Sequence, residues 1–369
     1  MTFMNDIIET YVRRNQDQWL ELLKTIISIP SPTGREQVKG KWILQYLHSL
    51  GADGAYRDDS GNILYPCRLK KGQKAALYTA HMDTVFEKLS EIPIHQSKNI
   101  LSAPSCSDNS ASIAGLLFII KMIFDLKLTP PQGILFAFDV GEEGLGNLKG
   151  IRQIMTDWAG RISEVVAVDC TFDTFVATAV GSRRYEVTIE TPGGHSWMGF
   201  GNANAIAAAA SVIDSLYSLS LPAEPKTTYN VGTISGGTTV NSIAAKVRFT
   251  VDLRSEDGTS LDSLDKAFHA LLEKPSRDVR ISLKSIGERP CSQVDQNPLV
   301  RRITAIRKQQ GLTTTCIAGS TDANIPLSQG IPAISFGFCR SRREHTLEES
   351  LDLDTFLPGM MQMLAFMGL

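Results

Sequence analysis

The feature that most constrains the fold is an alternation of short apolar, β-rich runs with helical stretches between about residues 75 and 180. This alternation is typical of a parallel sheet, because each parallel strand must return through a crossover helix. The clearest expected strands are 75–79, 133–140 and 165–168, and the clearest expected helix is 110–126. The first part of the chain therefore predicts an α/β domain with a mixed, mostly parallel sheet covered by helices.

The pattern changes between residues 181 and 288, where two helical stretches are set among four strand-like runs. The expected order is strand 185–190, helix 204–219, strands 227–234 and 245–253, helix 261–273 and strand 279–286. This β-α-β-β-α-β order is that of the ferredoxin-like unit. Residues 289–369 then return to α/β character. We expect one domain made of residues 1–180 and 289–369, with a smaller domain at 181–288 inserted into it.

Charge and hydropathy argue against nucleic acid and membrane as partners. The 369 residues are 43% hydrophobic and carry a formal net charge of −2, so no basic field would attract phosphate backbones or anionic lipid. The longest apolar run, 113–124, is interrupted by Lys121 and is too short to cross a bilayer. It predicts a buried helix.

The six cysteines predict free thiols. They are dispersed along the chain without a C-x-x-C pair, which favours a reducing compartment. Charged residues between positions 6 and 17 also interrupt any apolar stretch of the kind a signal peptide requires. We therefore expect a cytoplasmic protein.

Side chains that can bind metal ions follow the ends of several predicted strands. They are His81, Asp83, Glu142, Glu143 and Asp169, together with Asp108 just before the helix at 110 and His345 after the strand expected at 333–338. In open parallel sheets the carboxyl ends of the strands meet at one edge, so we expect these groups to converge there. Taken one at a time, each residue has a plainer interpretation: Asp108 and Asp169 could cap a helix and end a strand, and Glu142 and Glu143 could form a solvated turn.

Two imidazoles and several carboxylates, with no cysteine, suit zinc, cobalt or manganese. A site of this size predicts two divalent ions that share one carboxylate, with a water between them as nucleophile. The pair Glu142-Glu143 fits this scheme, because one carboxylate can bind metal while its neighbour acts as general base. The predicted reaction is metal-assisted hydrolysis of an amide bond.

Seven motifs, in order along nearly the whole chain, resemble those of the two-metal peptidase and deacylase family that includes aminoacylase, acetylornithine deacetylase, carboxypeptidase G and peptidase T. They are TAHMDTV at 79–85, SDNSA at 107–111, GEEG at 141–144, AVD at 167–169, GGHS at 193–196, STDAN at 320–324 and EHT at 344–346. The resemblance implies a zinc-exopeptidase fold whose inserted ferredoxin-like domain serves as lid and dimerisation domain.

The resemblance also implies roles for individual residues. One metal ion would be held by His81, Asp108 and Asp169, and the other by Asp108, Glu143 and His345, so that Asp108 is the bridge. Glu142 would be the general base. These assignments imply two zinc ions, with cobalt or manganese as alternatives.

Four further residues receive roles from the same resemblance. Asp83 would accept the second imidazole N–H of His81. His195 would reach the active site of the partner subunit in a homodimer, and Asn241 and Arg254 would hold the carboxylate of a small substrate. Plainer interpretations remain for all three residues of the insertion: a tight turn for His195, and surface contacts for Asn241 and Arg254.

Two positions depart from the common pattern. Asn109 stands where many relatives have a second Asp, which predicts altered local hydrogen bonding without loss of a metal ligand. Asp169 stands where the other branch has Glu, and so resembles the aminopeptidase and dipeptidase branch around peptidase T. The predicted substrates are short peptides. Two alternatives stay open: N-acyl amino acid deacylation or desuccinylation at the same site, and a non-catalytic relative that only binds a small molecule.

Overall fold

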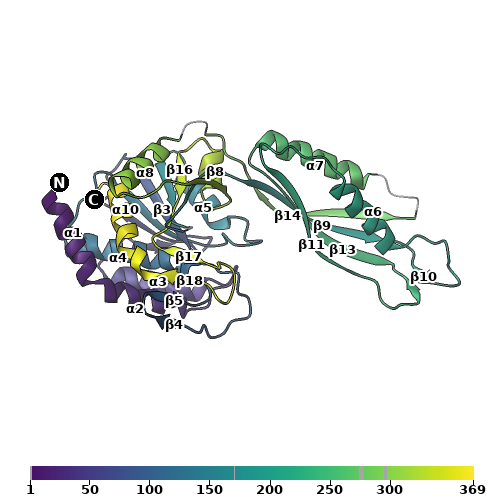
Figure 1. Cartoon of the computed structure of the whole chain (residues 1–369), viewed down its shortest axis with the longest axis horizontal. Helices are drawn as coiled ribbons and strands as arrows, with labels where there is room; N and C mark the ends of the chain where they lie inside the picture. The colour runs from purple at the N-terminus through teal and green to yellow at the C-terminus, as the bar shows by residue number, and fades with distance from the viewer. Residues whose placement is uncertain (1, 170, 274–277, 295–296) are drawn as a thin grey trace. The chain divides into compact units, whose positions relative to one another are not determined.

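The computed structural model describes residues 2–169, 171–273, 278–294 and 297–369, and it divides into two compact units (Figure 1). Unit 1 comprises Met1–Thr178 and Gln293–Leu369, and unit 2 comprises Ala179–Ser292. The mixed α/β class is confirmed. Each unit has its own apolar core.

A mixed eight-stranded sheet forms the centre of unit 1. Its order is β1 (Tyr56–Arg57), β2 (Ile63–Cys67), β6 (Ile134–Asp139), β3 (Ala75–His81), β7 (Ile162–Ala167), β16 (Ala333–Ser335), β8 (Phe175–Ala179) and β15 (Cys316–Gly319). The middle pairs β6-β3, β3-β7 and β7-β16 are parallel, whereas β2 pairs antiparallel with β6 and β8 pairs antiparallel with β16. Every residue of β3 is buried, as expected for a parallel strand covered on both faces.

Helices cover this sheet. They are α1 (Thr2–Arg14), α2 (Gln16–Ile27), α3 (Gln37–Ser49), α4 (Ser112–Asp125), α5 (Lys149–Asp157), α8 (Pro298–Gln309), α9 (Asn324–Ser328) and α10 (Phe356–Met367). Trp19 of α2 stacks on Phe356 of α10 at 3.7 Å between ring centroids, and Phe118 of α4 packs edge-on against the same ring. Aromatic contacts thus join helices from both ends of the chain.

The helix expected at 110–126 is observed as α4, and the segment before it, η1 (Cys106–Ala111), is kinked, with non-helical backbone at Asp108 and Asn109. Together they form a helical stretch of 20 residues that is long and apolar enough to cross a membrane. However, 78% of its apolar window is buried inside the protein. It is therefore a core helix, as the sequence predicts, although longer than the apolar run alone indicates.

A second, four-stranded sheet of unit 1 joins segments far apart in sequence. Its order is β17 (Arg340–Arg342), β18 (Ser350–Asp352), β5 (Ile100–Ser102) and β4 (His95–Ser97). β5 leads into η1, whereas β18 follows the turn that contains His345. The sequence did not predict these strands, because each has only three residues and an irregular pattern of burial. The strand expected at 333–338 accordingly ends at Ser335, and the chain then enters β17.

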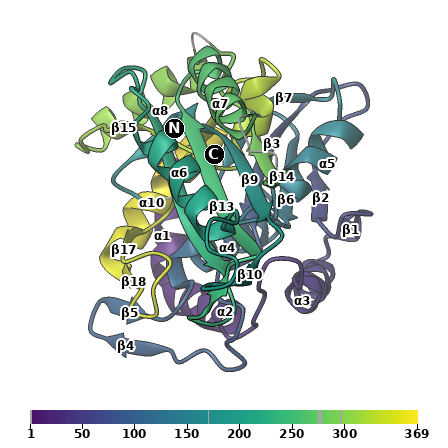
Figure 2. The same ribbon diagram turned by 90° about the vertical axis from the view of Figure 1, so that its right-hand side faces the viewer.

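Unit 2 has the predicted β-α-β-β-α-β order (Figure 2). Its sheet runs β11 (Thr227–Gly236), β13 (Lys246–Ser255), β9 (Gly181–Glu190) and β14 (Arg280–Arg289). The helices α6 (Ala205–Tyr217) and α7 (Gly258–Leu272) contact each other and the two central strands. A short antiparallel pair, β10 (Gly194–His195) with β12 (Ser242–Ile243), completes the unit.

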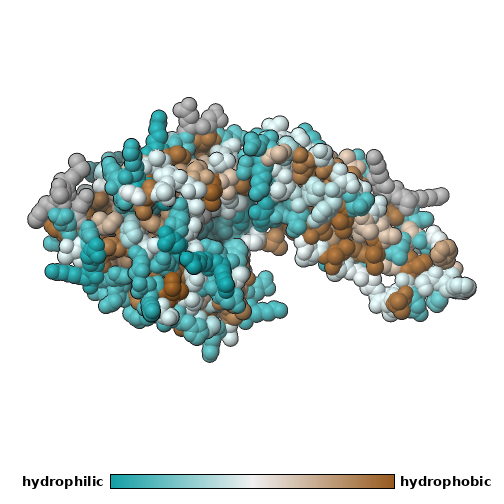
Figure 3. All heavy atoms as spheres, in the orientation of Figure 1, coloured by the Kyte–Doolittle hydropathy of each residue, from teal (hydrophilic) through white to brown (hydrophobic). Residues whose placement is uncertain are grey.

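Apolar side chains are also exposed on unit 2, and brown residues are visible on its surface in Figure 3. Its exposed large hydrophobic residues are Trp197, Met198, Phe200, Ile206, Tyr217, Ile234 and Val240. They make up half of the fourteen found in the described part of the chain, although unit 2 is the smaller unit. An apolar surface of this kind is typical of a region that contacts another protein.

Candidate metal centre

His81 is the last residue of the buried strand β3. Its Nδ1 donates to the backbone carbonyl of Asp83 at 3.1 Å, whereas the nearest carboxylate oxygen of Asp83 lies at 3.5 Å. Asp83 is thus the partner of His81, as the sequence predicts, and its backbone carbonyl is a closer acceptor than its carboxylate. Because a carbonyl can only accept, Nδ1 carries a proton, and Nε2 is the ring nitrogen that is left to face a metal ion.

The carboxylate of Asp83 instead organises the neighbouring loop. It accepts the backbone N–H groups of Glu142 at 3.0 Å and Glu143 at 2.9 Å, and the hydroxyl of Thr33 at 2.9 Å. The loop follows β6, which lies beside β3 with Asp139 paired to His81. Gly141 turns the chain there with a φ of +70°. Asp83 thus fixes the two adjacent glutamates relative to His81.

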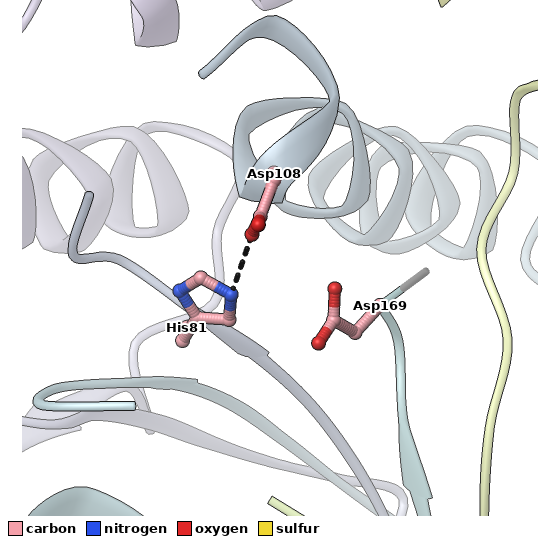
Figure 4. A group of neighbouring side chains, drawn as sticks. All are labelled: His81, Asp108 and Asp169. Carbon is pink, nitrogen blue, oxygen red and sulfur yellow. Dashed lines mark ion pairs between the residues drawn. The ribbon is translucent and has the colours of Figure 1, made fainter. Parts of the chain in front are cut away.

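Asp108 lies in η1, and the peptide bond that joins it to Asn109 is cis. One carboxylate oxygen of Asp108 lies 3.0 Å from Nε2 of His81, as the dashed line in Figure 4 shows. The other oxygen lies 2.9 Å from Nε2 of His345. Asp108 therefore stands between two imidazoles that come from distant parts of the chain.

Asp169 completes one group of possible ligands. It follows β7, and Figure 4 shows its carboxylate beside His81 and Asp108. The ligand atoms of these three residues all lie within 4.8 Å of one another. The amide of Asn109 donates to the carbonyl of Val168 at 2.9 Å, which links η1 to the end of β7. An ionised Asp could not make this bond, so Asn109 changes the local hydrogen bonding as predicted.

A second group consists of Asp108, Glu143 and His345. Nε2 of His345 lies 3.2 Å from a carboxylate oxygen of Glu143, and the backbone of His345 is left-handed, with a φ of 63°. A third combination, His81 with Glu142 and Glu143, satisfies the same distance criterion. Both proposed three-residue sets that share Asp108 are therefore brought together, and Glu142 lies beside them.

The pKa values of three side chains in the cluster, His81, His345 and Glu143, are raised, so each side chain binds a proton more readily than usual. Burial opposes protonation of His81, but the carboxylates beside it raise its pKa well above the ordinary value. The nearby carboxylates of Asp108 and Glu143 raise the pKa of His345 to about 11. Burial raises the pKa of Glu143 to about 7, and the negative charges of Asp108 and Glu142 act in the same direction. Carboxylates crowded in this way are relieved by a bound cation.

Three buried atoms show that metal ions fit this cluster. Nε2 of His81, one carboxylate oxygen of Asp108 and one of Glu143 are buried without a well-formed hydrogen bond. Buried acceptors are nearly always satisfied by a donor, a water molecule or a metal ion. All three atoms belong to the ligand groups described above, and imidazole with carboxylate is a donor set suited to zinc. The donor sets of the residues present therefore fit two divalent cations.

His195 lies in unit 2, within β10 and after the turn formed by Gly193 and Gly194. Its side chain is exposed, and its Nδ1 accepts the backbone N–H of Trp197 at 3.2 Å. Nδ1 must therefore be unprotonated, and in the neutral ring the proton is on Nε2. His195 is thus in the tautomer that can donate a hydrogen bond through Nε2.

Asn241 and Arg254 also lie in unit 2. The side-chain oxygen of Asn241 accepts the hydroxyl of Thr239 at 3.0 Å, and the backbone carbonyl of Asn241 accepts the N–H of Ser196. Arg254 pairs with Asp252 at 2.7 Å. Asn241 is therefore attached to the His195 segment, whereas Arg254 makes the surface ion pair that the plainer interpretation describes.

Two residues near the cluster were not singled out from the sequence. Thr33 lies between α2 and α3, and Glu349 follows His345 by four residues. Glu349 is completely buried. The only sequence signal for Glu349 is its position shortly after a candidate ligand, and an acidic residue there is indistinguishable from its exposed neighbour Glu348.

Comparison with known proteins supports the resemblance. Residues 178–280 match the model of the M20 peptidase dimerisation domain. A tripeptidase from Staphylococcus aureus has the same fold, with a TM-score of 0.79 at 20% identity over 96% of this chain and 98% of that one. A dipeptidase from Saccharomyces cerevisiae has a TM-score of 0.77 at 16% identity, over 100% of this chain and 98% of that one. The fold of the M20 peptidases and their dimerisation domain are both confirmed.

Relatives found by sequence are named as probable carboxypeptidases. One from Aspergillus terreus is 23% identical over 287 residues, which is 71% of this chain and 66% of that protein. Another, from Aspergillus fumigatus, is 27% identical over 226 residues, or 56% of this chain and 51% of that protein. The alignments thus span about half to two thirds of these relatives' length.

Proposed function

We propose that this chain, which has the fold and the dimerisation domain of the M20 peptidases, is a two-metal hydrolase that cleaves an amide bond of a short peptide. The observation that carries the proposal is the position of Asp108. Its two carboxylate oxygens lie 3.0 and 2.9 Å from Nε2 of His81 and of His345. A carboxylate placed between two imidazoles is the arrangement that a shared pair of cations requires.

The ligand assignment follows the two groups. His81, Asp108 and Asp169 would hold one cation, and Asp108, Glu143 and His345 the other. Bound there, two divalent ions supply Lewis-acid activation of water and of the substrate carbonyl. Zinc is the metal we propose, with cobalt and manganese as substitutes that accept the same ligands.

Glu142 is the general base in this scheme. Its backbone is fixed by the bond to Asp83, and its carboxylate lies beside His81 and Glu143. Glu142 takes one proton from the attacking water and delivers it to the leaving nitrogen as the C–N bond breaks. The products are a carboxylic acid and an amine, so one water is consumed for each bond cleaved.

The residues of unit 2 take supporting roles. His195 can donate from Nε2 to the oxygen that becomes negative during attack, acting in a homodimer on the partner's substrate. Asn241 and Arg254 would bind the substrate's carboxylate, for which Arg254 must exchange its bond to Asp252.

The test of the reaction is Glu142→Gln, which keeps the size of the side chain and removes the base. We expect turnover to fall by about 10²- to 10⁴-fold while two metal ions remain bound. The control is Glu348→Gln, which removes a charge from an exposed position and should leave turnover unchanged. Activity of Glu142→Gln close to that of the wild type would exclude this mechanism.

The substrate is tested separately. We propose short peptides with a free amino group, because Asp169 matches the aminopeptidase and dipeptidase branch and the tripeptidase and dipeptidase structures share the fold. The metal-loaded enzyme would be assayed on unblocked di- and tripeptides beside N-acetyl and N-succinyl amino acids. Faster hydrolysis of the peptides is expected, and preference for the acylated amino acids would make the protein a deacylase.

We also propose that the protein functions in the cytoplasm. The five cysteines of the described residues are all free thiols, and four of them are buried; Cys170 lies outside the described residues. Free thiols are stable in a reducing compartment. Fractionation of cells that express a tagged chain would test the assignment, and recovery in a secreted fraction would contradict it.

A further inference from the structure

Glu349 belongs to neither group of metal ligands, yet its carboxylate is tied to the segment that carries Asp108. One oxygen accepts the backbone N–H of Ser107 at 2.7 Å, the hydroxyl of Ser107 at 2.6 Å and the N–H of Asp108 at 3.0 Å. The other oxygen accepts the N–H of Ser105 at 3.2 Å. Four donors from one short segment thus converge on a single side chain, and bonds of this kind to a carboxylate are stronger than neutral ones.

The backbone of Glu349 is attached to the same segment. Its carbonyl accepts the N–H of Ala103 at 3.1 Å, directly beside the point where Ser350 of β18 pairs with Ser102 of β5. Its own N–H donates to the carbonyl of Thr346 at 3.3 Å, which closes the turn just after His345. Glu349 therefore joins the turn that carries His345 to the segment that carries Asp108.

This connection bears on the metal site, because Asp108 and His345 approach within 2.9 Å only if the two segments keep their spacing. Residues 107 and 349 are 242 positions apart, so the chain itself does not impose that spacing. β17, β18, β4 and β5 are short strands, and the loops between β5 and η1 and between β17 and β18 are irregular. The buried carboxylate of Glu349 adds four hydrogen bonds to the short strand pairing that joins these segments.

We propose that Glu349 is a positioning residue that aligns Asp108 with His345 and so raises the affinity of the site for both metal ions. The proposal rests on the proposed two-metal function. Glu349 itself touches neither the ions nor the substrate and acts through the backbone of Asp108. Residues that orient metal ligands typically affect affinity about 10- to 100-fold when they are removed.

The test is a zinc titration of the metal-free protein in competition with a chromophoric chelator. Glu349→Ala should weaken zinc binding about 10- to 100-fold. Glu349→Gln should recover part of that loss, because its amide oxygen can still accept the three bonds to Ser107 and Asp108. Glu348→Ala, at the exposed neighbouring position, is the control and should bind zinc like the wild type.

A residue with only a structural role would lower the melting temperature and leave zinc affinity unchanged, so unchanged affinity in folded Glu349→Ala overturns the proposal. If Glu349→Ala does not fold, Ser107→Ala tests the proposal instead, because it removes only the 2.6 Å hydrogen bond from the Ser107 hydroxyl to Glu349. We expect it to weaken zinc binding about 2- to 10-fold, the effect of one hydrogen bond, and no change would overturn the proposal. Absence of zinc binding by the wild type would instead overturn the proposed function itself.

Discussion

Asp83 shows how one side chain can set the geometry of a whole site. It is completely buried, and its carboxylate accepts bonds from two backbone N–H groups and the hydroxyl of Thr33. Burial works against its ionisation, but the hydrogen bonds and the nearby imidazole lower its pKa below the ordinary value. Asp83 is therefore an ionised acceptor that holds Glu142, Glu143 and His81 in one arrangement.

Asp83→Asn tests this role. The amide group of Asn would face at least one of the donors that now point at the carboxylate, so the loop with Glu142 and Glu143 should shift. We expect zinc affinity to fall about 10- to 100-fold and turnover to fall with it. Isothermal titration with zinc and steady-state kinetics would measure both effects. Thr33→Ala, which removes one donor and leaves the carboxylate intact, should produce a much smaller change, and equal effects of the two variants would count against this role.

At the scale of single residues, the sequence identified most ligand candidates because they follow strand ends, and Asp108 because it precedes a helix. It could not identify Glu349, whose importance comes from contacts with a segment 242 residues away. It named Asp83 as the partner of His81 but not which oxygen accepts, because the carbonyl and the carboxylate lie 3.1 and 3.5 Å from Nδ1 and only the folded backbone sets these distances. The role of Asn109 as donor to Val168 likewise depends on how η1 meets β7.

Among the elements, α10 is held close to the chain that leads toward β17. A Cβ placed on Gly359 of this helix would lie 1.8 Å from the backbone oxygen of Phe338. Phe338 in turn occupies the space beside Gly115 of α4, where a Cβ would lie 2.3 Å from its ring. Two helices from different parts of the sequence therefore pack closely against Phe338, because each has a glycine at the point of contact.

Gly359→Ala is expected to destabilise the protein. The backbone of Phe338 cannot move aside as a flexible side chain can, so the added methyl group must displace α10. We expect this to lower the free energy of unfolding by about 3 kcal/mol or more. Denaturation by urea would measure it. Gly258→Ala in the first turn of α7 is the matched control, since its nearest neighbour would lie 4.0 Å away and helix propensity favours Ala. A Gly359→Ala variant as stable as the wild type would show that α10 is not packed in this way.

Long elements were predictable and short ones were not. The helices expected at 204–219 and 261–273 are observed at Ala205–Tyr217 and Gly258–Leu272, and the four strands and two helices of unit 2 occur in the expected order. These elements have clear periodicity over ten or more residues. The sheet of β17, β18, β5 and β4 has no such pattern, because its strands form through pairing between distant segments. It is this sheet that carries His345 and Asp108 to their positions.

For the molecule as a whole, the match of residues 178–280 to a peptidase dimerisation domain predicts a homodimer. The exposed apolar residues of unit 2, which include Trp197, Met198 and Phe200, are consistent with a protein contact there. Sedimentation equilibrium should show a dimer at micromolar concentration. A monomer with full activity would contradict both the dimer and the proposed role of His195 in the partner's site.

The central claim is that His81 and His345 hold two cations that share Asp108. Anomalous diffraction at the zinc edge, from crystals of the zinc-loaded protein, tests it most directly. We predict two peaks roughly 3.5 Å apart, one on each side of the Asp108 carboxylate, each about 2.0 to 2.2 Å from its imidazole and carboxylate ligands. Soaking with a chelator should remove both peaks. Zinc bound elsewhere, or no zinc peak beside these imidazoles, would contradict the account.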